Sequence, residues 1–331
     1  MKKLLTTMVA AVACYAGVAS AAEIKPAVVY DLGGRFDRSF NQGAYNGAEK
    51  YKADTGTEYR DFEIQNDSQR EQAMRNFARR GMNPIVAIGF SQASALEKVA
   101  TEFPDIKFTI VDMVVDLPNV QSVVFKEHEG SFLVGVLAAM ASKTGKVGFI
   151  GGMDIPLIRK FACGYAQGVK HANADAEVFQ NMTGTTGAAW NDPVKGGELA
   201  KSQFDRGADV VYHAAGGTGV GVLQAAADAG KLGIGVDSNQ NALHPGSVLT
   251  SMLKRVDVAV YEAFDAAAND TWEPGVTVLG LAEGGVDWAL DENNEKLITD
   301  DMKAAVAKAK EEIISGNLEV HDYMSDSTCP M

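Results

Sequence analysis

The chain has 331 residues, of which 46% are hydrophobic and 22% are charged, and its net charge at pH 7 is −13. Such a composition is typical of a globular protein, and a chain of this length usually forms two domains rather than one core. The acidity argues against a nucleic-acid-binding protein, which needs basic patches to displace counterions.

Residues 1–22 are predicted to be a signal peptide. Lys2 and Lys3 precede an apolar core, and Ala19-Ser-Ala21 has the small-x-small pattern of a signal peptidase site. A lipoprotein signal ending at Cys14 is the alternative, but the residues before Cys14 lack the usual Leu. No later segment has the roughly 18 consecutive apolar residues of a membrane helix. We therefore expect a periplasmic protein, which is membrane-anchored only if Cys14 is lipidated.

After the signal, short apolar runs alternate with longer helical stretches. Runs that are apolar throughout are typical of strands covered on both faces, and their alternation with helices predicts parallel βαβ units. The predicted strands are 27–30, 84–88, 108–111, 146–150, 209–212 and 233–236. The predicted helices are 41–53, 69–80, 93–102, 131–143, 157–171, 194–206 and 220–229. The expected fold class is α/β.

The second half of the chain repeats features of the first half in the same order. Each half begins with an apolar strand that ends at two glycines, followed by a helix with the spacing Phe-x-x-Gly-x-x-x-Gly, starting at Phe40 and Phe161. Later in each half an apolar strand is followed by Asp112 or Asp237. We therefore expect two similar lobes, each a parallel sheet flanked by helices.

Hinge strands are expected between the lobes, because no Pro/Gly/Ser-rich linker separates the two halves. The candidate hinge segments are 119–125 and 246–252. A return crossing would make both lobes discontinuous. The predicted division is 23–125 plus about 252–285 for the N-terminal lobe, and about 126–251 plus about 286–331 for the C-terminal lobe.

Two cysteines follow the signal peptide, Cys163 and Cys329. In an oxidising compartment they can pair and attach the C-terminal tail. The alternative is that Cys163 is a small helix residue and Cys329 lies on a loose tail, 325–331. A metal site is not expected, because no Cys-x-x-Cys motif or histidine cluster accompanies them.

Motifs for catalysis or cofactor binding are weak. The glycines at 216–221 have the spacing Gly-x-Gly-x-Gly instead of the dinucleotide-binding Gly-x-Gly-x-x-Gly, and the sequence has no Walker Gly-Lys-Ser/Thr and no Gly-x-Ser-x-Gly elbow. The five histidines are scattered. We expect neither a cofactor nor an enzyme. The enzymatic alternative at this point is a dehydrogenase that uses the glycine loop.

Ligand binding is better supported. Ligands of open parallel sheets bind beyond the carboxyl ends of the strands, and Asp31, Asp112 and Asp237 each follow a predicted strand. Such carboxylates can accept hydrogen bonds from hydroxyls or ring N–H groups, while Phe40 and Trp190 offer flat faces to a ring. Alternatively, each Asp is a helix cap or turn former and Phe40 is a core residue.

Several blocks of the sequence carry a resemblance to a known family. They are Asp31-Leu-Gly-Gly-Arg-Phe-Asp-Arg-Ser-Phe-Asn-Gln-Gly43, Gly89-Phe-Ser-Gln-Ala-Ser-Ala-Leu96, Phe103-Pro-Asp-x-Lys-Phe108 with Val111-Asp112, Asn191-Asp-Pro-x-Lys-Gly-x-Glu-Leu-Ala200, Ala215-Gly-Gly-Thr-Gly219 and Gly235-Val-Asp237. They span nearly the whole chain after the signal peptide. The sequence resembles the basic membrane protein family of substrate-binding lipoproteins, also called purine nucleoside receptor proteins.

The resemblance implies a type I periplasmic binding protein that delivers purine nucleosides to an ABC importer, whose permease and ATPase are other chains. It implies that Phe40 stacks on the base, that Asp31 and Asn41 lie beside the ligand, and that Asp112 reads the purine edge. A monomer is expected. A free nucleobase, a sugar or the ligand of a sensor are the alternative cargoes. A nucleoside-cleaving hydrolase is the remaining enzymatic alternative.

The resemblance also implies that Asp237 and Lys254 bind the ribose and that Gly217 provides a backbone contact. The aromatic opposite Phe40 is Trp190 or Tyr212. Family members are commonly lipidated, which the poor lipobox here does not support. The full predicted set of ligand-binding residues is Asp31, Phe40, Asn41, Ser91, Asp112, Trp190, Gly217, Asp237 and Lys254.

Overall fold

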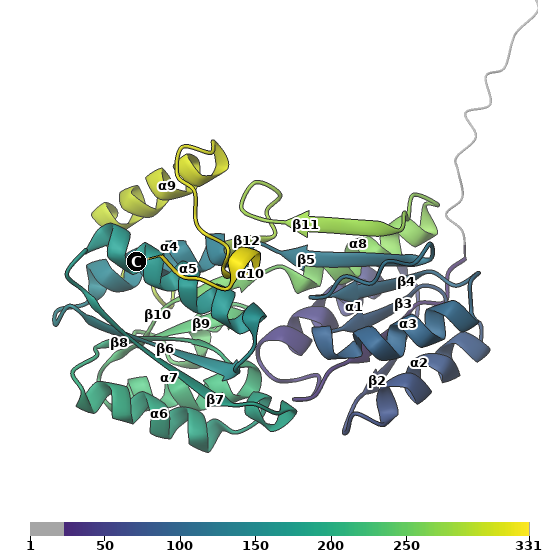
Figure 1. Ribbon diagram of the computed structural model, residues 1–331, viewed down its shortest axis with the longest axis horizontal. Helices are drawn as coiled ribbons and strands as arrows, with labels where there is room; N and C mark the ends of the chain where they lie inside the picture. The colour runs from purple at the N-terminus through teal and green to yellow at the C-terminus, as the bar shows by residue number, and fades with distance from the viewer. Residues whose placement is uncertain (1–22, 331) are drawn as a thin grey trace, which may run out of the picture.

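The computed structural model describes residues 23–330, which form two six-stranded sheets with helices on both faces of each (Figure 1). The predicted α/β fold with two lobes is confirmed. The predicted signal peptide and Cys14 lie outside the described residues. Within 23–330, no helix is both long enough and apolar enough to cross a membrane.

The N-terminal lobe is built on an entirely parallel sheet with the order β11-β5-β4-β3-β1-β2. Its strands are β1 (Ala27–Tyr30), β2 (Arg60–Glu63), β3 (Ile85–Ile88), β4 (Phe108–Val111), β5 (Val120–Phe125) and β11 (Gly275–Leu279). Its helices are α1 (Phe40–Thr55), α2 (Gln69–Arg79), α3 (Ala93–Glu102) and α8 (Val256–Ala268). Every residue of β1, β3 and β4 is buried, as expected for strands covered on both faces.

The C-terminal lobe has a sheet with the order β12-β10-β9-β8-β6-β7. Its strands are β6 (Lys146–Met153), β7 (Glu177–Gly184), β8 (Val210–Ala214), β9 (Leu232–Asp237), β10 (Val248–Lys254) and β12 (Val286–Trp288). Its helices are α4 (Glu127–Ala141), α5 (Pro156–Ala172), α6 (Pro193–Asp205), α7 (Gly219–Asp228), α9 (Asp300–Ile314) and α10 (Tyr323–Asp326). This sheet is parallel except at one edge, where β12 is antiparallel to β10.

The repeated glycine spacing brings helices into close contact in both lobes. A Cβ atom on Gly47 of α1 would lie 2.1 Å from the carbonyl oxygen of Asp257 in α8. A Cβ atom on Gly168 of α5 would lie 2.0 Å from the carbonyl oxygen of Phe132 in α4. Only glycine permits backbones to approach this closely. The repeat therefore encodes the same tight helix pair twice.

The chain crosses between the lobes three times, after β5, after β10 and between β11 and β12. The three crossings are linked by backbone hydrogen bonds, from Lys126 N–H to the Leu279 carbonyl at 2.9 Å and from Arg255 N–H to the Gly285 carbonyl at 2.9 Å. We propose that these side-by-side segments are the hinge. The predicted hinge segments 119–125 and 246–252 correspond to β5 and β10, each of which lies within a single sheet. The chain crosses between the lobes just after each of these strands.

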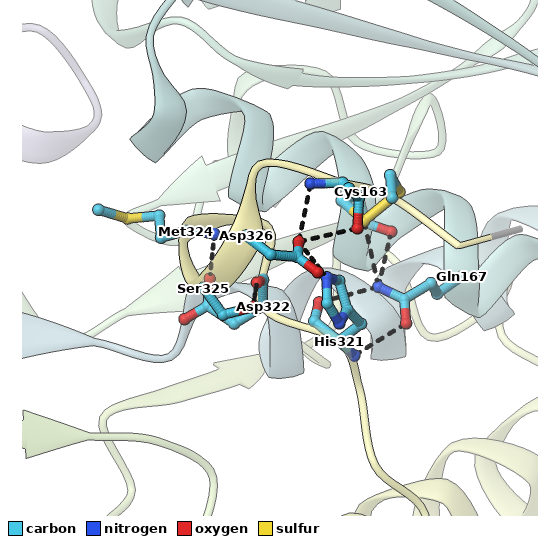
Figure 2. The surroundings of a disulfide bond; sticks show 9 residues. Cys163, Gln167, His321, Asp322, Met324, Ser325 and Asp326 are labelled. Carbon is cyan, nitrogen blue, oxygen red and sulfur yellow. Dashed lines mark hydrogen bonds and ion pairs between the residues drawn. A yellow bond between two sulfur atoms is a disulfide. The ribbon is translucent and has the colours of Figure 1, made fainter.

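The C-terminal tail is attached to α5 by a disulfide between Cys163 and Cys329 (Figure 2). The two Cα atoms are 5.6 Å apart, and 166 residues separate the cysteines in sequence. Of the two readings that the sequence left open, the structure shows the pairing. The prediction of a loose tail is wrong, because α10 and the disulfide hold it against α5.

Candidate ligand-binding site

A pocket of about 580 Å³, part of it open to solvent, lies between the lobes at the carboxyl ends of the strands. The N-terminal lobe lines it with residues that follow β1, β3 and β4. The C-terminal lobe lines it with residues at the ends of β8, β9 and β10, with residues of α5, and with Trp190, which follows β7. Its lining comprises Asp31, Leu32, Asp37, Phe40, Asn41, Gly89, Phe90, Asp112, Leu157, Ile158, Phe161, Trp190, Ala214, Gly216, Val236, Asp237 and Lys254.

The pocket contains most of the residues that were predicted to bind the ligand. Those that line it are Asp31, Phe40, Asn41, Asp112, Trp190, Asp237 and Lys254. Ser91 does not line it and instead donates a hydrogen bond to the Asp31 carboxylate. Gly217 lies next to the lining residue Gly216. The ligand contacts of all these residues stay predictions.

Asp31 is buried and its charge is balanced by Arg70 of α2, whose Nη1 is 2.5 Å from Asp31 Oδ1. Asn41 supports the same turn, because its Oδ1 accepts from Asp31 N–H at 3.0 Å and its amide donates to the Asp31 carbonyl. Both side chains are therefore held by the protein before any ligand arrives, and they shape the end of β1.

Asp112 follows β4 and has a left-handed backbone, with φ 71°. Lys254, at the end of β10 in the opposite lobe, places Nζ 2.7 Å from both Asp112 carboxylate oxygens and 2.9 Å from Glu127 Oε1. Burial raises the pKa of Asp112 to about 6, against the opposing effect of Lys254. Burial disfavours the charge on Lys254, but the two carboxylates outweigh it and raise the pKa of Lys254 above its usual value.

Asp237 follows β9 in the C-terminal lobe and also has a left-handed backbone, with φ 63°. Its Oδ2 accepts a hydrogen bond from the hydroxyl of Ser39, which precedes α1 in the N-terminal lobe. Burial raises the pKa of Asp237 to about 6. Non-glycine residues with this backbone are uncommon and cluster at functional sites, so the paired Asp residues mark the pocket.

Aromatic rings line both sides of the pocket. Phe40 comes from the N-terminal lobe, and Phe161 and Trp190 come from the C-terminal lobe. A Cβ atom on Gly152 would lie 2.1 Å from the Trp190 ring, so this glycine makes room for the indole. Tyr212 is fully buried in the core outside the pocket lining, which leaves Trp190 as the sequence candidate that faces the pocket.

Residues 24–323 match the profile of the family described as ABC transporter substrate-binding protein PnrA-like. The chain belongs to this family. This PnrA-like protein is 35% identical over 322 residues to the ABC transporter nucleoside-binding protein BmpA of Lactococcus lactis, with 90% of this chain and 89% of the relative covered. It is also 35% identical to an uncharacterised lipoprotein of Pyrococcus furiosus, with 84% and 73% covered.

Among solved structures, the PnrA-like protein is similar to an ABC transporter solute-binding protein from Aeropyrum pernix. The TM-score is 0.82 and the sequence identity 31%, with 89% of this chain and 92% of the other covered. The family resemblance predicted from the sequence blocks is thereby confirmed. The PnrA-like protein is a substrate-binding protein of an ABC transporter, with a small-molecule ligand and the transporter as partners.

Three important residues of this PnrA-like site were not predicted. Phe161 was detectable, because the sequence repeat aligns it with Phe40. Arg70 lies on α2, and Glu127 opens α4. Nothing in the local sequence distinguishes them from solvated charges, because their partners Asp31 and Lys254 are distant in sequence.

The site of the PnrA-like protein can accept hydrogen bonds and stack a ring. Asp237 accepts one hydrogen bond, from Ser39, among the described residues and keeps acceptor capacity for ligand hydroxyl or N–H groups. Lys254 has three N–H donors, of which Asp112 and Glu127 engage at least two. Residues 23–330 contain no group of three or more acidic, His or Cys side chains placed to hold a metal ion.

Proposed function

We propose that this protein binds a purine nucleoside in the pocket between its lobes and delivers it to an ABC importer. The observation that carries the proposal is the combination of aromatic faces from both lobes with a carboxylate from each lobe whose side chain is buried, Asp112 and Asp237. The nucleoside-binding relative from Lactococcus lactis, at 35% identity, supports the same ligand class.

In the proposed complex the base stacks on Phe40, with Trp190 on the opposite side, and Asp112 accepts hydrogen bonds from the purine edge. Asp237 accepts from the ribose hydroxyls, Lys254 donates its remaining N–H to the ribose, and Gly217 contributes a backbone contact. A site built to pair a hydroxyl strongly rejects an analogue that lacks it, because the carboxylate is then left without its partner.

Closure of the two lobes around the ligand is part of the proposal. Several hydrogen bonds already join the lobes beside the pocket. Ser39 donates to Asp237, Ser238 Oγ donates to the Ser39 carbonyl at 2.7 Å, and Gln240 Nε2 donates to the Arg38 carbonyl at 2.9 Å. A hinge that opens these contacts would admit the ligand, and the buried hydrogen bonds to the ligand would stabilise the closed form.

A calorimetric titration tests the proposal directly. The purified protein is unfolded and refolded to remove carried ligand, then titrated with adenosine, guanosine, inosine, cytidine, 2′-deoxyadenosine, adenine and ribose. We expect tight binding of the purine ribonucleosides and much weaker binding of 2′-deoxyadenosine and ribose. Binding of adenine or ribose without binding of any nucleoside would indicate that the ligand is a free base or a sugar. An absence of heat from all seven compounds would overturn the proposal.

Export to the periplasm as a monomer completes the proposal, in agreement with the signal-like residues 1–22.

Incubation of a bound nucleoside with the protein, followed by chromatography for free base, tests the enzymatic alternative. We expect the nucleoside to be recovered intact. Release of free base at a rate proportional to the protein concentration would identify a hydrolase instead.

A further inference from the structure

Beyond the pocket, a row of buried charges of alternating sign connects Lys254 with the C-terminal tail. The N···O distances along it are 2.7, 2.9, 3.1 and 3.3 Å, and we call it the charge chain. Its members, in order, are Asp112, Lys254, Glu127, Lys160 and Asp322. Only Asp322, at 34% side-chain exposure, contacts solvent to a substantial extent.

Glu127 is the central member of the charge chain. Oε1 faces Lys254 and Oε2 faces Lys160, and neither oxygen has another partner among the described residues. Burial alone would raise the pKa of Glu127, but the two lysines outweigh it and lower the pKa below its usual value. A buried carboxylate held by two cations has a fixed position, because any movement leaves charges without compensation.

Lys160 connects the charge chain to the hinge and to the pocket wall. It lies on α5, and its Nζ donates to the carbonyl of Phe125, the last residue of β5 before the chain crosses between the lobes, at 2.7 Å. The next residue, Phe161, lines the pocket. The position of the Lys160 ammonium group is therefore coupled both to the crossing and to an aromatic wall.

The tail holds Asp322 in place from both sides (Figure 2). Before it, His321 N–H donates to Gln167 Oε1 at 2.9 Å, and Gln167 Nε2 donates to the His321 carbonyl at 3.0 Å. After it, Cys329 is bonded to Cys163. Cys163 and Gln167 are four residues apart on α5 and therefore lie on the same helix face. The segment that carries Asp322 is therefore attached to α5 on both sides of this residue, which holds the Asp322 carboxylate near Lys160.

We propose that Glu127 and Lys160 are positioning residues for Lys254, and that the disulfide-bonded tail, through Asp322, is part of the ligand-binding apparatus. The inference rests on the proposed function, because its main readout is nucleoside affinity. Removal of one charge from a buried row leaves its neighbour uncompensated, and that neighbour moves toward solvent or another partner. A change at Asp322 is therefore expected to alter the position of the Lys254 ammonium group by way of Lys160 and Glu127.

Guanosine affinity, measured by calorimetry, tests the charge chain from its outer end. We expect Asp322→Asn and Cys329→Ser each to weaken guanosine binding about threefold, and Glu127→Gln to weaken it about tenfold. The variant Asp322→Glu should bind guanosine with wild-type affinity, because it keeps the charge. The matched control is Arg159→Met, which removes a neighbouring cation of α5 that pairs with Asp154 on the surface. This control should bind guanosine with unchanged affinity.

A double-mutant cycle separates positioning from a general loss of structure. The effects of Asp322→Asn and Lys160→Met should not add, because both break the same path. Wild-type affinity in both Asp322→Asn and Cys329→Ser would overturn the inference. These two variants also decide the question if Glu127→Gln does not fold.

A second readout does not depend on the ligand. Acetic anhydride should acetylate Lys160 faster in Asp322→Asn and Cys329→Ser than in the wild type, as followed by peptide mass spectrometry. Unchanged acetylation would contradict the inference even if the wild-type protein bound no nucleoside. The failure of the proposed function and the failure of the charge chain are therefore distinguishable.

Discussion

The two lobes present the same carboxylate in the same way but hold it differently. Asp112 follows β4 and Asp237 follows β9, both with a left-handed backbone, and each is contacted by a side chain from the opposite lobe. In one case that side chain is the ammonium group of Lys254, and in the other it is the hydroxyl group of Ser39.

This difference separates two roles. Asp112 belongs to a buried ionic network in which each charge needs its neighbour. Asp237 has a neutral partner and is more available to a ligand. The repeated lobe topology therefore fixes where the carboxylates lie, while the contacts between the lobes decide what each one does.

The largest effect is expected from Lys254→Met, which removes the charged partner of Asp112. Two buried carboxylates, Asp112 and Glu127, lose their cation, and we expect the free energy of unfolding to fall by about 3–5 kcal/mol. Urea denaturation at pH 7 measures it. The control Lys310→Met removes a partly exposed partner of Asp287 and should cost less than about 1 kcal/mol. Equal losses in the two variants would contradict the ionic role assigned to Lys254.

Asp237→Ala tests the more available carboxylate. We expect guanosine binding to weaken by about 2–4 kcal/mol, because ribose hydroxyls lose a charged acceptor in a buried site. Calorimetry with guanosine measures it, and Asp228→Ala, at the exposed end of α7, is the control. A change below measurement error would remove Asp237 from the ligand site.

The pH dependence of stability sharpens the comparison. Because the pKa of Asp237 is raised to about 6, the folded state keeps a proton that the unfolded state releases from about pH 4 upward. This carboxylate therefore lowers stability as the pH rises to about 6. Relative to the wild type, Asp237→Asn should gain about 1–3 kcal/mol between pH 4 and pH 7 in thermal unfolding.

Asp112→Asn is the matched comparison for this experiment. It should show a similar gain between pH 4 and pH 7, because burial raises the pKa of Asp112 to about 6 as well, against the opposing effect of Lys254. A gain in Asp237→Asn with none in Asp112→Asn would contradict the raised pKa of Asp112, and would show that the ion pair with Lys254 outweighs burial in the folded state.

The smallest effect is expected from Ser39→Ala, which removes the neutral partner of Asp237. One hydrogen bond between the lobes is lost, and we expect guanosine affinity to fall by about 1 kcal/mol. Calorimetry beside the exposed control Ser315→Ala measures it. A loss as large as that of Asp237→Ala would mean that the hydroxyl itself is essential to the site.

Prediction from sequence succeeded for β1, β3, β4, β6, β8 and β9 and failed at the sheet edges, while the interior strands β5 and β10 were predicted as hinge segments. The strands that no predicted segment covers, among the described residues, are β2, β7, β11 and β12, which are the four edges. Interior strands are covered on both faces and appear as continuous apolar runs. Edge strands need no such run. In β11, four of the five residues are exposed, and only its pairing with β5 makes it a strand.

The candidate site shows the same division. The placement of Asp112 and Asp237 followed from their position after predicted strands, and Phe161 was detectable as the counterpart of Phe40. Lys254 has the local sequence of a solvated charge, yet its side chain is 2% exposed. Its burial depends on where the chain crosses between the lobes after β10, which no local pattern encodes.

The sequence by itself determined the family, the two-lobed α/β fold and the carboxylates at the strand ends, because periodicity, glycine spacing and strand boundaries are properties of neighbouring residues. Only the tertiary structure decided which charges meet. Asp31 with Arg70, Lys254 with Glu127 and Lys160 with Asp322 are joined across 39, 127 and 162 positions of the chain. A buried charge is stable only where packing supplies its partner, so these pairs exist in the fold and not in any single segment.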